Sequence, residues 1–346
     1  MKMDLMHSKK SLMPALVLSG MFLFESISIG QVLPISGISW EGVLGTSGSA
    51  SSGIQNVIDG KFSTTSFQEW IGPGGVTVDL GVAKNVDRLV MITRPTTGVA
   101  IPQQGYVEVS LDGVSWTKVK DYNNSDAVAG GSVLTLGFGT QLARYVRFTM
   151  STPGVNAQIG EIQLFNGNGP RVSLIDRGPS WNATNETSNR YPYYLVDQNP
   201  TTFGLYSLST GYLTLRLDSV EYANGWNSIK LDGRSFPPPG LPSNPGIVTV
   251  YVGDDLGNLT SIYSESFSEQ ESNYSFLLEM EETRTEKYIK IEWEKNPDWT
   301  SNQQNVQFFG VDVIPVVPEP RTIVLILVAT GCFLLSRGRL CKKGLS

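Results

Sequence analysis

The chain has 346 residues, of which 17% are charged, with 36 glycines and 19 prolines, and its formal net charge is −6. This composition is typical of a folded, turn-rich β protein, and the length suffices for two domains. The only histidine is His7 and the only cysteines are Cys332 and Cys341, so residues 31–318 contain neither type. This central part therefore lacks the side chains for Ser-His-Asp and Cys-His nucleophilic sites, structural zinc, haem, iron–sulfur clusters and disulfides.

Residues 1–30 are organised like a secretory signal. Three lysines precede an apolar run over residues 12–24, and a stretch of small residues ends at Gly30. This order predicts cleavage by signal peptidase and export of the chain. An uncleaved anchor helix is the alternative, although the apolar run is short for a span of ~20 residues.

Five segments of the first half have counterparts in the second half, in the same order and at an offset near 140 residues. The pairs are 57–64 and 195–202, 76–80 and 213–217, 105–113 and 246–254, 143–148 and 286–291, and 159–165 and 308–314. The preserved order predicts two copies of one domain, over residues 31–168 and 169–315, with the joint around residues 166–170.

The paired segments alternate apolar and polar residues, which places Val, Ile, Leu, Phe and Tyr on one face of each strand. This pattern is typical of antiparallel sheets packed face to face around a core ~10 Å thick. No stretch of the sequence has the periodicity of an amphipathic helix over a length that would favour one. The sequence therefore predicts an all-β chain of two tandem β-sandwiches, each large enough to bury a core without disulfides.

The predicted mature part of the chain is acidic. Residues 31–318 contain 18 Lys and Arg against 29 Asp and Glu, a net charge of −11. An acidic surface repels phosphate backbones, so we expect no nucleic-acid partner. Seven glutamates lie between residues 265 and 286, and we expect this segment to form a solvated loop and strand edge.

Residues 316–346 contain three unlike features in a fixed order. Pro318, Glu319 and Pro320 precede an apolar segment over residues 322–335, and a basic tail follows. An apolar helix with a basic cytoplasmic end predicts a single membrane helix with its positive end inside. The order resembles the PEP-CTERM sorting signal of Gram-negative bacteria. The resemblance implies transient membrane anchoring and cleavage by an exosortase near the Pro-Glu-Pro motif; an ordinary tail anchor is the alternative.

The first predicted copy contains a second set of recognisable motifs, which cover about residues 37–167. They are Asp59-Gly60 with Thr64, the strand 76–80, Gly105-Tyr106-Val-Glu-Val-Ser, Asp112-Gly113-Val-Ser-Trp116, Ala143-Arg-Tyr-Val-Arg147 and Ile159-Gly-Glu-Ile162. As a set they resemble the discoidin, or coagulation factor 5/8 type C, family, whose bacterial branch includes family 32 carbohydrate-binding modules. The resemblance implies a galactose-binding-like jelly roll that binds sugars through loops at one end, and residues 171–315 look like a diverged copy.

The same resemblance implies a structural calcium ion held by the Asp-Gly loop and a glutamate on the last strand. Carried over to this chain, the ligands are Asp59, Thr64 and Glu161, and their oxygens suit Ca²⁺. Alternatively, Asp59 caps a turn and Glu161 faces solvent. In the second copy Asp197 keeps its place in the loop, but Gly310 stands where Glu161 aligns, so one charge is lost.

Sugar recognition needs an exposed aromatic face and polar groups that hydrogen-bond to hydroxyls. Arg94, Gln103 and Gln104 follow the apolar strand 89–93 and are candidates for binding hydroxyls, and Trp299 is a candidate in the second copy. Two further tryptophans are expected to serve in core or loop packing: Trp70 and Trp116.

Three functions remain open from the sequence. The first is an exported, non-catalytic protein of the cell surface, outer membrane or extracellular matrix that binds a polysaccharide or glycan, such as the cell's own exopolysaccharide. The second is a structural or adhesive surface protein with no ligand site. The third is a glycoside hydrolase that uses only carboxylates, which needs two facing acids. The predicted repeat fills nearly the whole body and leaves no separate catalytic domain, so we expect the first function.

Overall fold

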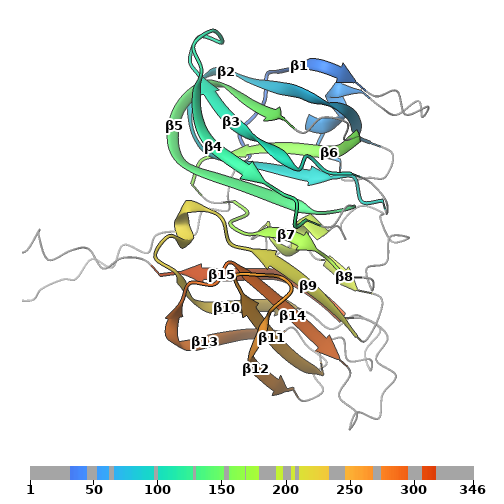
Figure 1. Ribbon diagram of the computed structural model, residues 1–346, viewed down its shortest axis with the longest axis vertical. Helices are drawn as coiled ribbons and strands as arrows, with labels where there is room; N and C mark the ends of the chain where they lie inside the picture. The colour runs from blue at the N-terminus through green and yellow to red at the C-terminus, as the bar shows by residue number, and fades with distance from the viewer. Residues whose placement is uncertain are drawn as a thin grey trace, which may run out of the picture.

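The computed structural model describes residues 32–44, 53–61, 66–96, 100–127, 130–151, 156–167, 169–178, 192–197, 204–206, 210–233, 246–267, 274–294 and 306–316 (Figure 1). The predicted signal peptide and membrane helix lie outside these ranges. Within them, the structure contains no helix with the length and apolar character needed to cross a membrane.

The described residues form β-strands joined by turns and short 3-10 helices, with no α-helix among them, which confirms the all-β prediction. We call the part from β1 to β6 the N-terminal unit; its elements are β1 (Gly37–Leu44), η1 (Ile54–Ile58), β2 (Gln68–Thr93), β3 (Gln104–Ser110), β4 (Thr117–Asn123), β5 (Val133–Met150) and β6 (Asn156–Phe165). The C-terminal unit contains β7 (Ser173–Asp176), η3 (Pro192–Leu195), β8 (Gly204–Tyr206), β9 (Gly211–Arg216), η4 (Val220–Tyr222), β10 (Trp226–Gly233), β11 (Ile247–Gly253), β12 (Thr260–Ser266), β13 (Tyr274–Arg284), β14 (Tyr288–Glu294) and β15 (Val306–Pro315).

The two units share an order of antiparallel strands. In the N-terminal unit β2 pairs with β5, β5 with β3, and β3 with β4. In the C-terminal unit β9 pairs with β14, β14 with β11, and β11 with β12. In the N-terminal unit β1 and β6 also pair with β2, β6 in parallel, and the C-terminal unit has a separate sheet in the order β13–β10–β15–β8.

Each unit has its own cluster of buried apolar side chains, built from the inward positions of these strands. Trp70 is fully buried in the N-terminal cluster and stacks on Trp40, with the ring centroids 4.6 Å apart, which confirms its predicted place in the core. Trp116 is half-buried, and the guanidinium carbon of Arg147 lies 4.1 Å from the centroid of its ring, so this tryptophan serves in packing as expected.

One sheet continues through both units. The short strand β7 pairs with β5 at Val133 and Leu174 and also with β9, and Figure 1 shows β7 between the two units. The apolar run 89–92 of β2 is therefore covered on both faces: Leu89 and Met91 pack in the N-terminal core, while Val90 and Ile92 pack in the C-terminal one. Strands buried on both faces have such unbroken apolar runs rather than alternation.

Two buried arginines fix the junction of the units. Arg88 of β2 donates hydrogen bonds to the carbonyl oxygens of residues 169 and 170, each at 2.9 Å. Arg216 of β9 donates to Asn124 and to Asp126 of the N-terminal unit, each at 2.6 Å, and is 0% exposed. Because a buried charge is costly unless it is paired, these contacts require the two units to stay packed together.

Candidate functional site

The predicted metal ligands Asp59 and Glu161 lie close together at one end of the N-terminal unit. The helix η1 ends at Asp59, and Gly60 follows with φ +72°, a conformation that glycine adopts at no steric cost. This turn aims the N–H of Gly60 at both carboxylate oxygens of Glu161, at 3.2 and 3.3 Å. The carboxylate of Asp59 accepts a hydrogen bond from the hydroxyl of Ser66 at 2.7 Å.

Glu161 is 3% exposed, so the alternative in which it faces solvent is wrong. Burial raises the pKa of its carboxyl to about 8, and the charge of Asp59 adds to this, while the hydrogen bond from Gly60 acts in the opposite direction. A buried carboxylate beside a second carboxylate is unstable as an anion unless a cation lies between them or beside them. Without such a cation Glu161 takes up a proton instead, and the ammonium of Lys61 lies 3.7 Å from a carboxylate oxygen of Asp59.

The donor chemistry of this pair fits calcium, which takes about six to eight oxygen ligands. Asp59 and Glu161 supply carboxylate oxygens from the described residues. The predicted third ligand, Thr64, lies outside the described residues. In the part of the chain that the structure describes, no group of three or more His, Cys, Asp or Glu is placed to hold a metal. Further ligands would have to be hydroxyl, carbonyl or water oxygens.

The C-terminal unit has a related arrangement without the second carboxylate. The helix η3 packs against β15 as η1 packs against β6, and the buried Asp197 follows η3. Gly310 occupies β15, and a Cβ built on it would lie 4.0 Å from the carbonyl oxygen of Leu195. The N-terminal unit thus has a carboxylate, that of Glu161, where the C-terminal unit has only a glycine.

Arg94, predicted to bind hydroxyls, lies next to Gly160, the residue before Glu161 on β6. Its Cα is 3.9 Å from the place where a Cβ on Gly160 would stand. Its guanidinium carbon lies 3.8 Å from the centroid of the buried Phe67 ring, and its Nη1 donates a hydrogen bond to Gln158 at 2.8 Å. These contacts hold the half-buried guanidinium in one orientation at this end of the unit.

The other predicted site residues are placed less fully. Gln103 and Gln104 are exposed at the start of β3, and their backbone carbonyls accept hydrogen bonds from the N–H groups of Asn124 and Ser151. The remaining predicted residues lie outside the described residues: Trp299, Pro318, Glu319 and Pro320.

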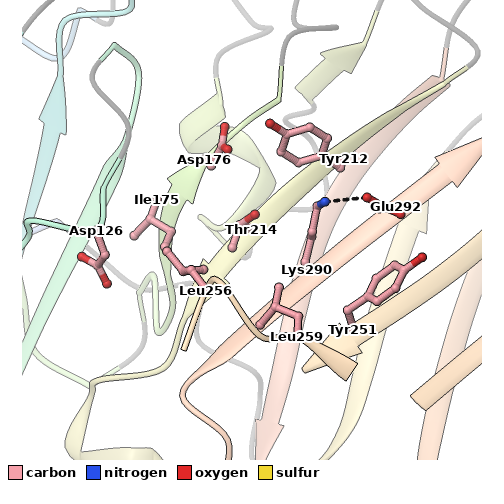
Figure 2. Close-up of a pocket in the computed structure, with 10 residues that line it drawn as sticks. All are labelled: Asp126, Ile175, Asp176, Tyr212, Thr214, Tyr251, Leu256, Leu259, Lys290 and Glu292. Carbon is pink, nitrogen blue, oxygen red and sulfur yellow. Dashed lines mark ion pairs between the residues drawn. The ribbon is translucent and has the colours of Figure 1, made fainter. Parts of the chain in front are cut away.

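A pocket of about 410 Å³ lies where the two units meet, and the sequence did not predict it (Figure 2). We call it the junction pocket; its lining residues are Asp126, Ile175, Asp176, Tyr212, Thr214, Tyr251, Leu256, Leu259, Lys290 and Glu292. In the sequence these residues look like the ordinary outward positions of strands and turns. The pairing of β9, β14 and β11 brings them together.

Residues 43–165 match the family model of the F5/8 type C domain. The match falls within the N-terminal unit, whose motifs predicted this resemblance. No curated protein matches the chain.

Solved structures similar to this chain include three from Clostridium perfringens. A family 32 carbohydrate-binding module in complex with GalNAc-β-1,3-galactose is 19% identical and covers 39% of this chain and 100% of its own, with a TM-score of 0.35. The family 32 module of NanJ in complex with galactose is 18% identical and covers 40% of this chain and 100% of its own, with a TM-score of 0.33. The two tandem family 32 modules of ZmpB in complex with GalNAc are 13% identical. They cover 82% of this chain and 90% of their own, with a TM-score of 0.33.

Proposed function

We propose that this chain is an exported, non-catalytic protein of the bacterial surface or extracellular matrix that binds carbohydrate. The observation that carries the proposal is the match of residues 43–165 to the F5/8 type C domain, a family that includes carbohydrate-binding modules. The absence of His and Cys from residues 31–318 supports a binding role, because it removes the side chains of most nucleophilic and metal-dependent catalysis.

The proposed sugar site lies at the end of the N-terminal unit that holds Arg94. A guanidinium offers several N–H donors in a fixed plane, which suits hydrogen bonding to sugar hydroxyls. Stacking on Phe67 and the hydrogen bond to Gln158 already orient the group, so little side-chain entropy is lost when a ligand binds. The exposed side chains of Gln103 and Gln104 are proposed as additional, weaker contacts.

Calcium is proposed as a structural ion beside this site, held by Asp59 and Glu161 with Thr64. The ion would supply positive charge that keeps both carboxylates ionised and ties the loop after η1 to β6. The buried position of Glu161 supports this role, because an ion there stabilises the loop without being reached by substrate.

A glycan array and polysaccharide pull-downs test the binding function, using the purified full-length chain with Ca²⁺ and with a chelator. We expect Arg94→Ala to abolish binding to the glycan identified. Arg144→Ala is the matched control, since this arginine of the same unit pairs with Asp79 instead, and it should bind normally. Silence across all glycans would favour the structural or adhesive alternative. Release of reducing sugar from any polysaccharide would contradict the non-catalytic assignment.

Export and sorting form a separate part of the proposal, which rests on the order of features in residues 1–30 and 316–346. We propose that signal peptidase removes the first segment and that an exosortase cleaves near Pro318-Glu319-Pro320. Expression in a Gram-negative host with and without its exosortase tests this. The shortened product should appear only with the enzyme, and Glu319→Ala should leave the precursor in the membrane. Equal processing in both hosts would indicate an ordinary tail anchor.

A further inference from the structure

The floor of the junction pocket is the outer face of three paired strands. Lys290 of β14 lies opposite Thr214 of β9 on one side and opposite Tyr251 of β11 on the other. Because side chains alternate along a strand, Tyr212 shares this face with Thr214. Figure 2 shows these side chains gathered on one side of the sheet. Two aromatic rings, a hydroxyl and an ammonium group therefore cover the floor.

The walls of the pocket come from both units. Asp126 belongs to the connection between β4 and β5 of the N-terminal unit, and Ile175 and Asp176 belong to β7. Leu256 and Leu259 come from the turn between β11 and β12, and Leu259 also packs against the core of the N-terminal unit. The part of the wall that Asp126 forms therefore depends on the packing of the two units.

The aromatic side chains of the pocket are held in fixed orientations. The hydroxyl of Tyr251 hydrogen-bonds to Glu292, which raises its pKa. Burial raises the pKa of Tyr212, whose hydroxyl hydrogen-bonds to Asp176. The ammonium of Lys290 lies 4.5 Å from the centroid of the Tyr212 ring and 2.5 Å from a carboxylate oxygen of Glu292. Groups fixed in advance lose little conformational freedom on binding a ligand, which favours affinity.

Thr214 presents a hydroxyl group to the pocket. Its side chain is 4% exposed and lines the pocket. A ligand hydroxyl that reaches this group can hydrogen-bond to it in place of water.

The charges of the pocket restrict its ligand. Asp126, Asp176 and Glu292 face a single ammonium, that of Lys290, and Asp126 is already paired with Arg216. Asp176 and Glu292 already contact Tyr212, Tyr251 and Lys290, but a carboxylate has room to accept further hydrogen bonds from hydroxyl or ammonium groups, and both repel an acidic ligand. The volume lies within the range of ~300–1,000 Å³ common for small-molecule pockets.

We propose that the junction pocket binds a non-acidic sugar, neutral or basic, as a second carbohydrate site. The apolar face of the pyranose packs on Tyr212 or Tyr251, and its hydroxyls contact Asp176, Glu292 and Thr214. The site shares its ligand class with the proposed function but uses none of the residues around Arg94. The two proposals can therefore fail separately.

Saturation-transfer NMR and calorimetry on the full-length chain test the pocket with three probes: a galacto-oligosaccharide, a chitosan oligosaccharide and an oligogalacturonate. We expect one or both of the first two to bind and the acidic probe to fail. Tyr212→Ala and the nearly isosteric Thr214→Val should each weaken binding at least tenfold. Tyr106→Ala, on the outer face of the N-terminal unit, is the control and should leave affinity unchanged.

Circular dichroism and thermal melting establish that each variant is folded before its affinity is compared. Binding of the acidic probe alone, or of none of the three, would overturn the proposal. So would binding that survives both pocket variants and disappears in Arg94→Ala, an outcome that leaves the proposed function intact. Retained binding in Arg94→Ala together with loss in Thr214→Val would assign the sugar to the junction pocket.

Discussion

The outer faces of the two units differ although their strands pair in the same order. Arg147 on β5 and Lys290 on β14 stand at equivalent places in the paired segments. Arg147 lies over Trp116 and forms an ion pair with Glu108 at 2.7 Å, so its face is covered. Lys290 lies beside the ring of Tyr212, and its face opens into the junction pocket.

This comparison separates what the strand order determines from what individual residues determine. The order fixes which side chains are neighbours, since a cation on the central strand meets residues of both adjacent strands. Whether the face is closed or hollow depends on the turn residues and on the other unit, which here contributes Asp126. Sites of different chemistry can therefore arise on similar sandwiches.

The largest expected effect concerns the contact on which the whole comparison depends, the packing of the two units. Arg216→Met leaves Asp126 and Asn124 without their buried partner, so we expect a loss of about 3–5 kcal/mol in the free energy of unfolding. Urea titration monitored by circular dichroism measures it. Lys118→Met removes an exposed ion pair with Asp121 and should cost less than about 1 kcal/mol. A loss of that small size for Arg216→Met would contradict the role assigned to the junction.

The second effect concerns calcium binding, which we expect at Glu161 of the N-terminal unit and not at the corresponding Gly310 of the C-terminal unit. Saturating Ca²⁺ at ~100 times its dissociation constant should add about 2.7 kcal/mol to the stability of the chain. Glu161→Gln should remove this gain, because it deletes a charged ligand while keeping the side chain's shape. Asp197→Asn, at the other end, should keep the gain in full. Thermal melting with Ca²⁺ and with a chelator measures this gain in stability for the wild type and both variants. Equal gains in the wild type and Glu161→Gln would refute the assignment of Glu161 as a calcium ligand.

The smallest effect compares the two equivalent cations. Arg147→Ala removes an ion pair and the stacking on Trp116, and we expect a loss of about 1 kcal/mol together with a red shift of tryptophan fluorescence. Lys290→Ala removes an ion pair beside an open pocket and should cost less. Chemical denaturation of both variants orders the two losses. A larger loss for Lys290→Ala would mean that the C-terminal face is the more tightly packed one.

The strand pattern of the fold was predictable because it is local. Alternation in the segments 105–113 and 286–291 follows from the two-residue period of a strand, and the strands β3 and β14 overlap them with bounds shifted by a few residues. The unbroken apolar run 89–92 also carries information, since it fits a strand covered on both faces. Which element covers its second face was not predictable, because no local pattern links β2 to β7.

The candidate sites depend on contacts between distant residues, and the sequence predicts these unequally. Asp59 and Glu161 are about 100 positions apart, and only the family resemblance paired them. The junction pocket had no such guide, because Tyr212, Lys290 and Tyr251 each occupy an ordinary outward position of a strand. Their meeting depends on strand register, and the contribution of Asp126 depends on how the units pack.

The position of β15 has a mechanical consequence. This ten-residue strand lies between β10 and β8 and is the last strand of the described residues. It pairs with β10 along most of its length. Tension that acts along the strand from its C-terminal end shears the ladder of hydrogen bonds as a whole, whereas tension across the strand would open it one bond at a time. A chain tethered at that end resists pulling through many bonds at once.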